Sequence, residues 1–264
     1  MNARQQFASD TSELAEQSLG SIAVNLPGAT AVFRAAKLDF CCHGNVSLRQ
    51  AAQDKNLDLN AVVAQLAALD HTDSLPDEMT VEALIDHIVS RYHDVHRAQL
   101  PELIRMAHRV ELVHKANPNV PAGLGNLLES VQQELLEHMM KEEQVLFPML
   151  RTGGHPFVSQ PIAMMRAEHI THGEELDRIN ALTNDATPPE GACNTWRALY
   201  IGLAQFGEDL QNHIHLENNV LFPVFEGAQG AATTTASAAV AATTAATATT
   251  TGCGGGGNGG CGCQ

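Results

Sequence analysis

The sequence predicts an all-α protein, an antiparallel four-helix bundle preceded by a small helical N-terminal domain. Two features of composition favour this class: only 4% of the 264 residues are aromatic, and runs of β-branched residues, which favour strands, are few. The third observation is that residues 80–226 contain four long amphipathic stretches, separated by short segments rich in Gly, Pro, Asn or Thr. With 44% hydrophobic residues, the chain can bury a sizeable core.

The small N-terminal domain is predicted over residues 18–72 as four short helical segments. Pro27, Gly44 and the region of Asp58 separate the segments, and a linker containing Pro76 follows them. The segments cover residues 22–24, 29–38, 47–53 and 61–69.

The bundle helices are predicted within residues 80–226. The first helix begins after Thr80, a residue type that caps helix N-termini, and continues to Val113 with a bend near Pro101. The other three helices cover residues 122–149, 162–182 and 194–224.

Residues 227–264 contain no charged side chain and consist mainly of Ala, Thr and Gly. Such a composition cannot offset the entropy of chain ordering, so we expect a low-complexity, disordered tail. Its cysteines, Cys253, Cys261 and Cys263, lack the paired spacing of a structural zinc site.

The second and fourth bundle helices carry the same motif. Residues 138–148 and 213–223 both read His-x3-Glu-x3-Leu-Phe-Pro. A spacing of four places His138 above Glu142 on one helix face, and likewise His213 above Glu217. One imidazole nitrogen and one carboxylate oxygen can then converge on a metal ion.

Both motifs lie on the apolar faces of their helices. At 100° per residue, Val145 falls on the same face as His138, and Val224 on the same face as His213. Burial of an unpaired carboxylate costs several kcal/mol, so each glutamate needs a compensating cation or proton. A histidine that hydrogen-bonds its own glutamate in the core is the alternative interpretation of each motif.

The other two bundle helices also contribute one inward histidine each. His93 shares its face with Val89, Leu100 and Ile104, and His169 shares its face with Ile162, Met165 and Leu176. Four histidines and two glutamates could give two metals two imidazoles each and two shared carboxylates, with open positions for an oxo group, water or a small gas. Mixed nitrogen and oxygen ligands in a bundle interior favour iron or manganese over structural zinc.

The remaining acidic and histidine side chains have weaker patterns. Glu134 and Glu168 could hydrogen-bond a ligand histidine or line an access path. His96 and His172 lie one turn beyond His93 and His169, at the edge of the apolar face. His114 lies about 31 Å beyond His93 on one helix, so it cannot reach the same metal. We expect His87 to be exposed, and no partner pattern is apparent for His43, His71, His108, His155 and His215.

The charge and the N-terminus limit the functional class. The formal net charge of −15 argues against nucleic acid as a partner, which would require a basic face. Residues 1–20 do not resemble a signal peptide, and no stretch has the bulky apolar residues of a membrane span. We therefore expect a cytoplasmic protein with no membrane partner, whose six cysteines are thiols.

Several motifs resemble the hemerythrin-like proteins of the repair-of-iron-centres family, di-iron proteins for iron–sulfur cluster repair. The resemblance covers residues 20–226 and includes residues 31–34, 38–44, 91–94, 138–143, 167–169 and 213–223. It implies two irons, oxo- and carboxylate-bridged, in the bacterial cytoplasm and a role after nitric oxide or oxidative damage. The implied ligands are His93, His138, Glu142, His169, His213 and Glu217, with both glutamates bridging.

The resemblance also assigns the adjacent Cys41 and Cys42 to a family pattern, although His43 departs from the small residue expected there. Adjacent cysteines are poor disulfide partners, but they could bind iron or nitric oxide briefly, or exchange with another thiol. A pair buried for packing is the alternative. We interpret Cys41 and Cys42 as a thiol relay.

The leading hypothesis is repair of damaged iron–sulfur clusters by iron supply, with damaged iron–sulfur proteins or a cluster scaffold as partners and nitric oxide or O2 as a small ligand. A nitric oxide-reducing enzyme, a hemerythrin-like O2 or nitric oxide sensor, and an interaction bundle without metal are the alternatives. A homodimer is left open.

Overall fold

The computed structural model describes residues 13–69 and 80–226, and these residues are helical without a strand. The predicted tail, the linker at Pro76 and His71 lie outside the described residues. Within the described ranges the predicted all-α class is confirmed, and one antiparallel bridge joins Ser18 to Ser47.

Between residues 19 and 67, the N-terminal region forms four short helices. Ser18, Ser47 and Asp58 cap three of them, because each side chain accepts a backbone N–H of the first turn. The helices are α2 (Leu19–Asn25), α3 (Ala29–Ala35), α4 (Leu48–Asp54) and α5 (Leu59–Ala67).

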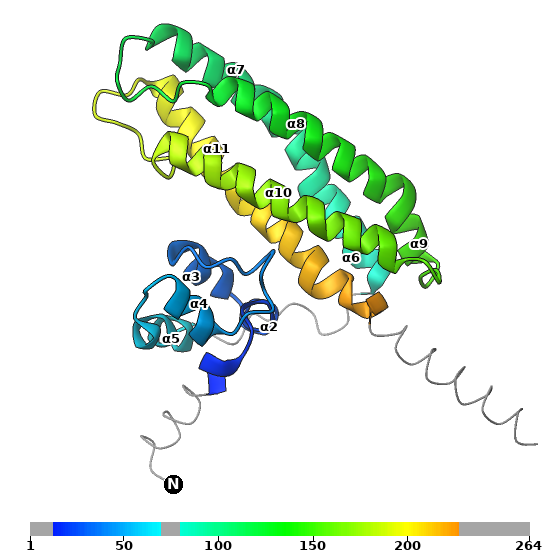
Figure 1. Ribbon diagram of the computed structural model, residues 1–264. Helices are drawn as coiled ribbons and strands as arrows, with labels where there is room; N and C mark the ends of the chain where they lie inside the picture. Colours follow the sequence, from blue (N-terminus) through cyan, green and yellow to red (C-terminus); the bar gives the residue numbers. More distant parts are fainter. Residues whose placement is uncertain (1–12, 70–79, 227–264) are drawn as a thin grey trace, which may run out of the picture. The chain divides into compact units, whose positions relative to one another are not determined.

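The first bundle helix begins directly after Thr80, its N-cap residue. The Thr80 side chain accepts the N–H of Ala83, and the first composite helix ends at Val113 without a break at Pro101. Figure 1 shows the long helices α7, α8, α10 and α11 running alongside one another. The elements are α6 (Val81–Ile88), η1 (Val89–His93), α7 (Asp94–Val113), α8 (Leu124–Lys141), η2 (Glu142–Leu146), α9 (Phe147–Arg151), α10 (Ser159–Thr183), α11 (Asn194–Leu216) and η3 (Glu217–Leu221).

Three π-helical turns, η1, η2 and η3, interrupt the bundle helices. Each π-turn adds a residue to the helical turn and rotates the residues that follow. The expectation that Val145 and Val224 share the buried faces of His138 and His213 is therefore wrong, since these valines are 53% and 54% exposed. Residues one to three positions away are buried instead: Leu146, Phe147, Leu221, Phe222 and Phe225.

The buried apolar residues of the described ranges form two clusters. The smaller cluster lies at the end formed by α6, α9 and the start of α10, and includes Ile85, Phe147 and Phe222. The larger cluster includes Trp196 and Phe206 on α11. No helix in the described ranges is both long and apolar enough to cross a membrane.

Candidate metal centre

Four histidines and two glutamates, all almost completely buried, converge inside the bundle. The sequence predicted these six residues, and each comes from a different element. His93 ends η1, His138 is on α8, Glu142 begins η2, His169 is on α10, His213 is on α11 and Glu217 begins η3.

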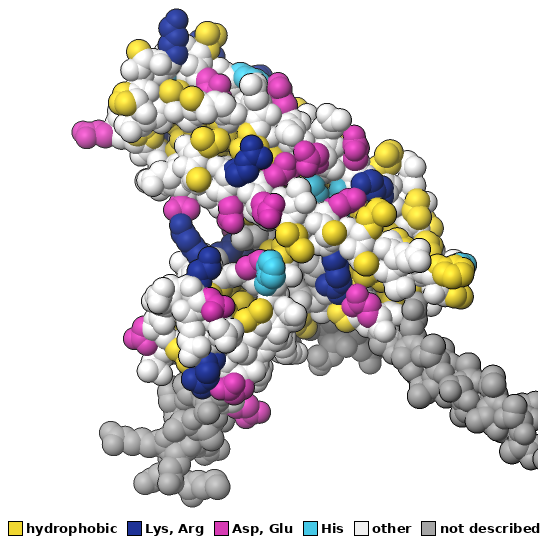
Figure 2. All heavy atoms as spheres, viewed as in Figure 1, with side chains coloured by type: hydrophobic (Ala, Val, Ile, Leu, Met, Phe, Trp, Pro, Cys, Tyr) yellow, Lys and Arg dark blue, Asp and Glu magenta, His cyan; other side chains and the backbone are white. Residues whose placement is uncertain are grey.

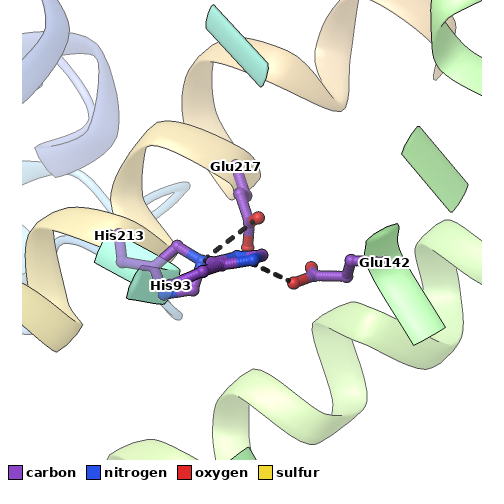
Figure 3. A group of neighbouring side chains, drawn as sticks. All are labelled: His93, Glu142, His213 and Glu217. Carbon is purple, nitrogen blue, oxygen red and sulfur yellow. Dashed lines mark hydrogen bonds and ion pairs between the residues drawn. The ribbon is translucent and has the colours of Figure 1, made fainter. Parts of the chain in front are cut away.

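The first cluster contains His93, His213 and both glutamates, and Figure 3 shows its side chains. Nε2 of His93 lies 3.4 Å from Oε2 of Glu142, and Nε2 of His213 lies 3.3 Å from Oε1 of Glu217. The two imidazole Nε2 atoms are 3.0 Å apart.

The second cluster contains His138, His169 and the other oxygen of each glutamate. Nε2 of His138 lies 3.3 Å from Oε1 of Glu142, and Nε2 of His169 lies 3.1 Å from Oε2 of Glu217. The two Nε2 atoms are 3.1 Å apart. Each glutamate thus directs one carboxylate oxygen to each histidine pair, the arrangement of a bridging ligand.

When the imidazoles are neutral, the polar atoms that face one another in the two clusters have no protons to share. Nδ1 of His93 lies 2.6 Å from the Glu143 carboxylate and Nδ1 of His138 lies 2.9 Å from the Glu168 carboxylate. Because a carboxylate only accepts, these Nδ1 atoms carry the protons and the Nε2 atoms present lone pairs to the centre. The oxygens of Glu142 and Glu217 have no hydrogen-bond partner within the described ranges. A cation in each cluster would satisfy these atoms.

The field of the carboxylates favours positive charge at this centre. Burial opposes protonation of His138, but Glu142 and Glu168 outweigh it and raise the pKa of His138 to about 10. The hydrogen bond from His138, assisted by Lys141, lowers the pKa of Glu168 to about 2. Both effects describe the metal-free chain, in which a proton takes the place that a metal cation would have.

Two family models match this chain. The Hemerythrin HHE cation binding domain matches residues 84–225, and a Domain of Unknown function (DUF542) matches residues 15–70. An iron–sulfur cluster repair protein YtfE of Yersinia pestis (strain Pestoides F) is 51% identical over 210 residues, which cover 78% of this chain and 95% of that protein. The protein of the same name from Yersinia pseudotuberculosis serotype O:1b (strain IP 31758) matches with the same identity and coverage. The chain belongs to the iron–sulfur cluster repair family.

Membership in the iron–sulfur cluster repair family confirms the predicted resemblance and the predicted fold. The hemerythrin domain of this family binds iron, and the two buried His/Glu clusters fit a di-iron site. The predicted iron cofactor is therefore confirmed.

Sequence reasoning missed two side chains that hold the histidines. Glu143 accepts from Nδ1 of His93 at 2.6 Å, and Oδ1 of Asn218 accepts from Nδ1 of His169 at 2.9 Å. Each directly follows a shared glutamate, at the same position in the two copies of the repeated motif. Their shared position in the repeated motif was the signal in the sequence that could have identified them.

The two acidic residues proposed to assist the site differ in their contacts. Glu168 accepts from His138, whereas Glu134 is exposed and accepts from Ser130 at 3.1 Å. His96 and His172 are buried beside the ligand rings, with centroids 5.5 Å from His213 and 5.0 Å from His138. They pack against these rings and make no hydrogen bond to them within the described ranges.

His114 lies away from both clusters. It caps the C-terminal end of α7, its Nε2 lies 3.2 Å from Sγ of Cys193, and its ring packs against Trp196. His87 is exposed, as expected. Four of the histidines without a predicted partner have one in the structure: His43 contacts Asp39, His108 contacts Glu129, His155 accepts from the backbone N–H of Phe157 and His215 contacts Asn219.

Cys41 and Cys42 are free thiols whose sulfurs are 3.7 Å apart. The Cys42 thiol donates to the backbone carbonyl of His169 at 3.3 Å, and the Cys41 carbonyl accepts from Nδ2 of Asn218 at 2.9 Å. The hydrogen bond with Cys42, burial and Asp39 raise the pKa of the Cys41 thiol. Asp39, Cys41 and Cys42 together form a third cluster that could hold a cation.

Proposed function

We propose that this chain repairs iron–sulfur clusters damaged by nitric oxide or by oxidative stress, and that its bundle supplies the iron. The observation that carries the proposal is the arrangement of Glu142 and Glu217: each directs one carboxylate oxygen to one buried histidine pair and the other oxygen to the second pair. The relatives at 51% identity are named iron–sulfur cluster repair proteins, which supports the same function here.

The proposed iron ligands are the six residues of the two buried clusters. His93 and His213 would bind one iron, His138 and His169 the other, and Glu142 and Glu217 would bridge both. Nitrogen and carboxylate ligands without thiolate suit iron in a bundle interior. We expect two irons per chain and an oxo-to-iron absorption band in the oxidised protein. A chain that holds one iron, or zinc when iron is abundant, would contradict the ligand set.

Cys41 and Cys42 are the proposed exit for the iron. The Cys42 thiol touches the backbone of the proposed ligand His169, and Asp39 adds a carboxylate to the two sulfurs. Because a thiolate binds Fe(II) and exchanges it with other thiols, this group could pass iron to a damaged iron–sulfur protein or to a cluster scaffold.

On the face shown in Figure 2, Lys and Arg side chains are dispersed among acidic ones, and no broad basic surface for a nucleic acid is visible there.

The test measures iron transfer and nitrous oxide together. A dehydratase with a [4Fe–4S] cluster is inactivated by nitric oxide, freed of the gas, and incubated without oxygen with the reduced full-length protein loaded with ⁵⁷Fe. We expect dehydratase activity to return with ⁵⁷Fe in its cluster, while metal-free protein restores none. Recovery without ⁵⁷Fe transfer would contradict iron supply. Catalytic release of nitrous oxide in a parallel reaction with nitric oxide would then favour the enzyme hypothesis.

A further inference from the structure

The repeat in the sequence of the bundle extends to the side chains around the metal centre. One repeat supplies His93 and His138, and the other supplies His169 and His213. In each repeat, a phenylalanine stacks on the histidine that lies outside the His-x3-Glu motif. Phe147 lies 5.7 Å from the ring of His93, and Phe222 lies 6.1 Å from the ring of His169. The equivalent pairs are His93 and His169, His138 and His213, Glu142 and Glu217, Glu143 and Asn218, Phe147 and Phe222, and Tyr92 and Glu168.

One histidine in each cluster is braced by a carboxylate and a cation. His93 donates to Glu143, which Arg97 contacts at 2.7 Å, and His138 donates to Glu168, which Lys141 contacts at 2.6 Å. Since each cluster has one such histidine, these braces do not distinguish the clusters.

The other histidine of each cluster does distinguish them. Nδ1 of His169 donates to the Asn218 amide oxygen at 2.9 Å, and the amide is itself fixed by the Cys41 carbonyl. Nδ1 of the buried His213 has no hydrogen-bond partner in the described part of the chain.

The lack of a partner has a cause in the sequence. Tyr92 takes the position that is equivalent to Glu168, and its ring stacks parallel to His213, with centroids 5.6 Å apart and 6° between the planes. His96 covers another side of the His213 ring, and its own nitrogens also have no partner within residues 13–69 and 80–226. Aromatic rings therefore surround His213 where a carboxylate braces His138.

A hydrogen bond from Nδ1 fixes the orientation of a ligand imidazole and makes Nε2 a stronger donor to the metal. Its loss typically weakens metal binding about 10–100-fold. We propose that the half-site of His93 and His213 releases its iron first, and that the half-site of His138 and His169 retains its iron. This inference rests on the ligand set in the proposed function and names the iron that the protein gives away.

Release kinetics test the order. The reduced, fully loaded protein is mixed without oxygen with excess ferrous chelator, and formation of the chelate is followed. We expect two phases of one iron each, with rates about 10–100-fold apart. A single phase that releases both irons would overturn the proposal.

Diffraction identifies the iron that remains. Crystals of protein depleted to one iron per chain are measured with anomalous scattering at the iron edge. The expected signal lies between His138 and His169. A signal between His93 and His213, or equal signals at both places, would overturn the proposal. Because neither measurement involves cluster repair, failure here is distinct from failure of the repair function.

Two variants of one residue test the cause. Asn218→Leu removes the partner of His169 and should accelerate the slow phase toward the rate of the fast phase. Asn218→Asp keeps an acceptor for His169 and should leave the slow phase slow, even if the contact with Cys41 weakens. Asn219→Ala breaks the neighbouring bonds of Asn219 to the Phe40 carbonyl and to His215 but leaves the Asn218 amide in place, so it should retain two phases. An unchanged slow phase in folded Asn218→Leu would overturn the proposed cause.

Discussion

Nδ1 of His138 on α8 donates a hydrogen bond to the carboxylate of Glu168 on α10, 2.9 Å away. Glu168 directly precedes His169, the proposed partner of His138 at the same metal. The helix that supplies one ligand of the pair therefore also orients the other ligand. Lys141 holds the second oxygen of Glu168 at 2.6 Å, so the carboxylate cannot turn freely away from the imidazole.

We predict that Glu168→Gln weakens iron binding without preventing folding. The amide oxygen can still accept from His138, but the charge that strengthens the bond is lost. The expected change is about 10–100-fold faster release of iron from the half-site of His138 and His169. Chelator competition with the loaded protein measures the rate.

Glu174→Gln is the matched control for Glu168→Gln. Glu174 is an exposed residue of the same helix, so its substitution should leave the release rates unchanged. If both variants release iron like the parent, the bond between His138 and Glu168 does not contribute to iron retention.

The helical spacing of His and Glu predicted the buried clusters because three to four residues per turn bring these side chains to one face. The same uniform spacing failed for Val145, which lies within the π-turn η2, and for Val224, which follows the π-turn η3. A π-turn depends on how the side chains and carbonyls of one turn pack, and a regular 100° rotation contains no information about it.

The contacts outside the six predicted residues were harder to predict. Glu143 and Asn218 occupy one position in two copies of a motif, but their targets, His93 and His169, are on helices that only the tertiary fold brings near. The same holds for the Cys42 thiol, whose acceptor is the carbonyl of His169, far along the chain.

We predict that Glu142→Leu and Glu217→Leu each lose one or both irons. Each substitution removes two carboxylate oxygens, one from each proposed metal position. The apolar leucine side chain fills the volume of the glutamate. Since a ligand bound only by the folded state stabilises it by about 2.7 kcal/mol at 100 times its dissociation constant, the variants should also melt at a lower temperature than the loaded parent. Iron analysis and thermal unfolding measure the two effects.

His114→Ala is the control, because it removes a histidine that is not a proposed iron ligand. His114 contacts Cys193 and Trp196, so this variant should keep two irons even if it is less stable. Two irons per chain in both glutamate variants would show that Glu142 and Glu217 are not ligands.

We predict that His96→Phe reduces the sensitivity of the metal-free protein to acid. Burial, together with His213 and His93, lowers the pKa of His96 from 6.5 to about 2. Between these values the unfolded chain binds a proton that the folded chain does not, so stability falls as the pH falls below 6.5. From about pH 7.5 to about pH 5.5 this group alone accounts for about 1.4 kcal/mol of lost unfolding free energy.

Urea unfolding of the metal-free parent and variant at the two pH values measures this difference. The phenylalanine has no proton to bind and packs against Phe206, so the variant should lose less stability on acidification. His155→Gln, at an exposed position, controls for the removal of a histidine. If the unfolding free energy of His96→Phe and that of the parent fall equally on acidification, His96 has the same pKa in the folded and unfolded chain.

We predict that the double substitution of Cys41→Ser and Cys42→Ser leaves the di-iron spectrum intact and slows cluster repair. The two thiols are not among the six residues that converge on the centre, so the irons should bind normally. Serine keeps a donor for the His169 carbonyl but cannot bind Fe(II) as a thiolate does, so transfer rather than storage should suffer. Both proteins are compared with the tail cysteines already replaced, which leaves Cys193 as the shared remaining thiol. Repair at the rate of the parent would return the pair to a packing role, and loss of iron would mean that these cysteines help to hold the centre through Asn218 and His169.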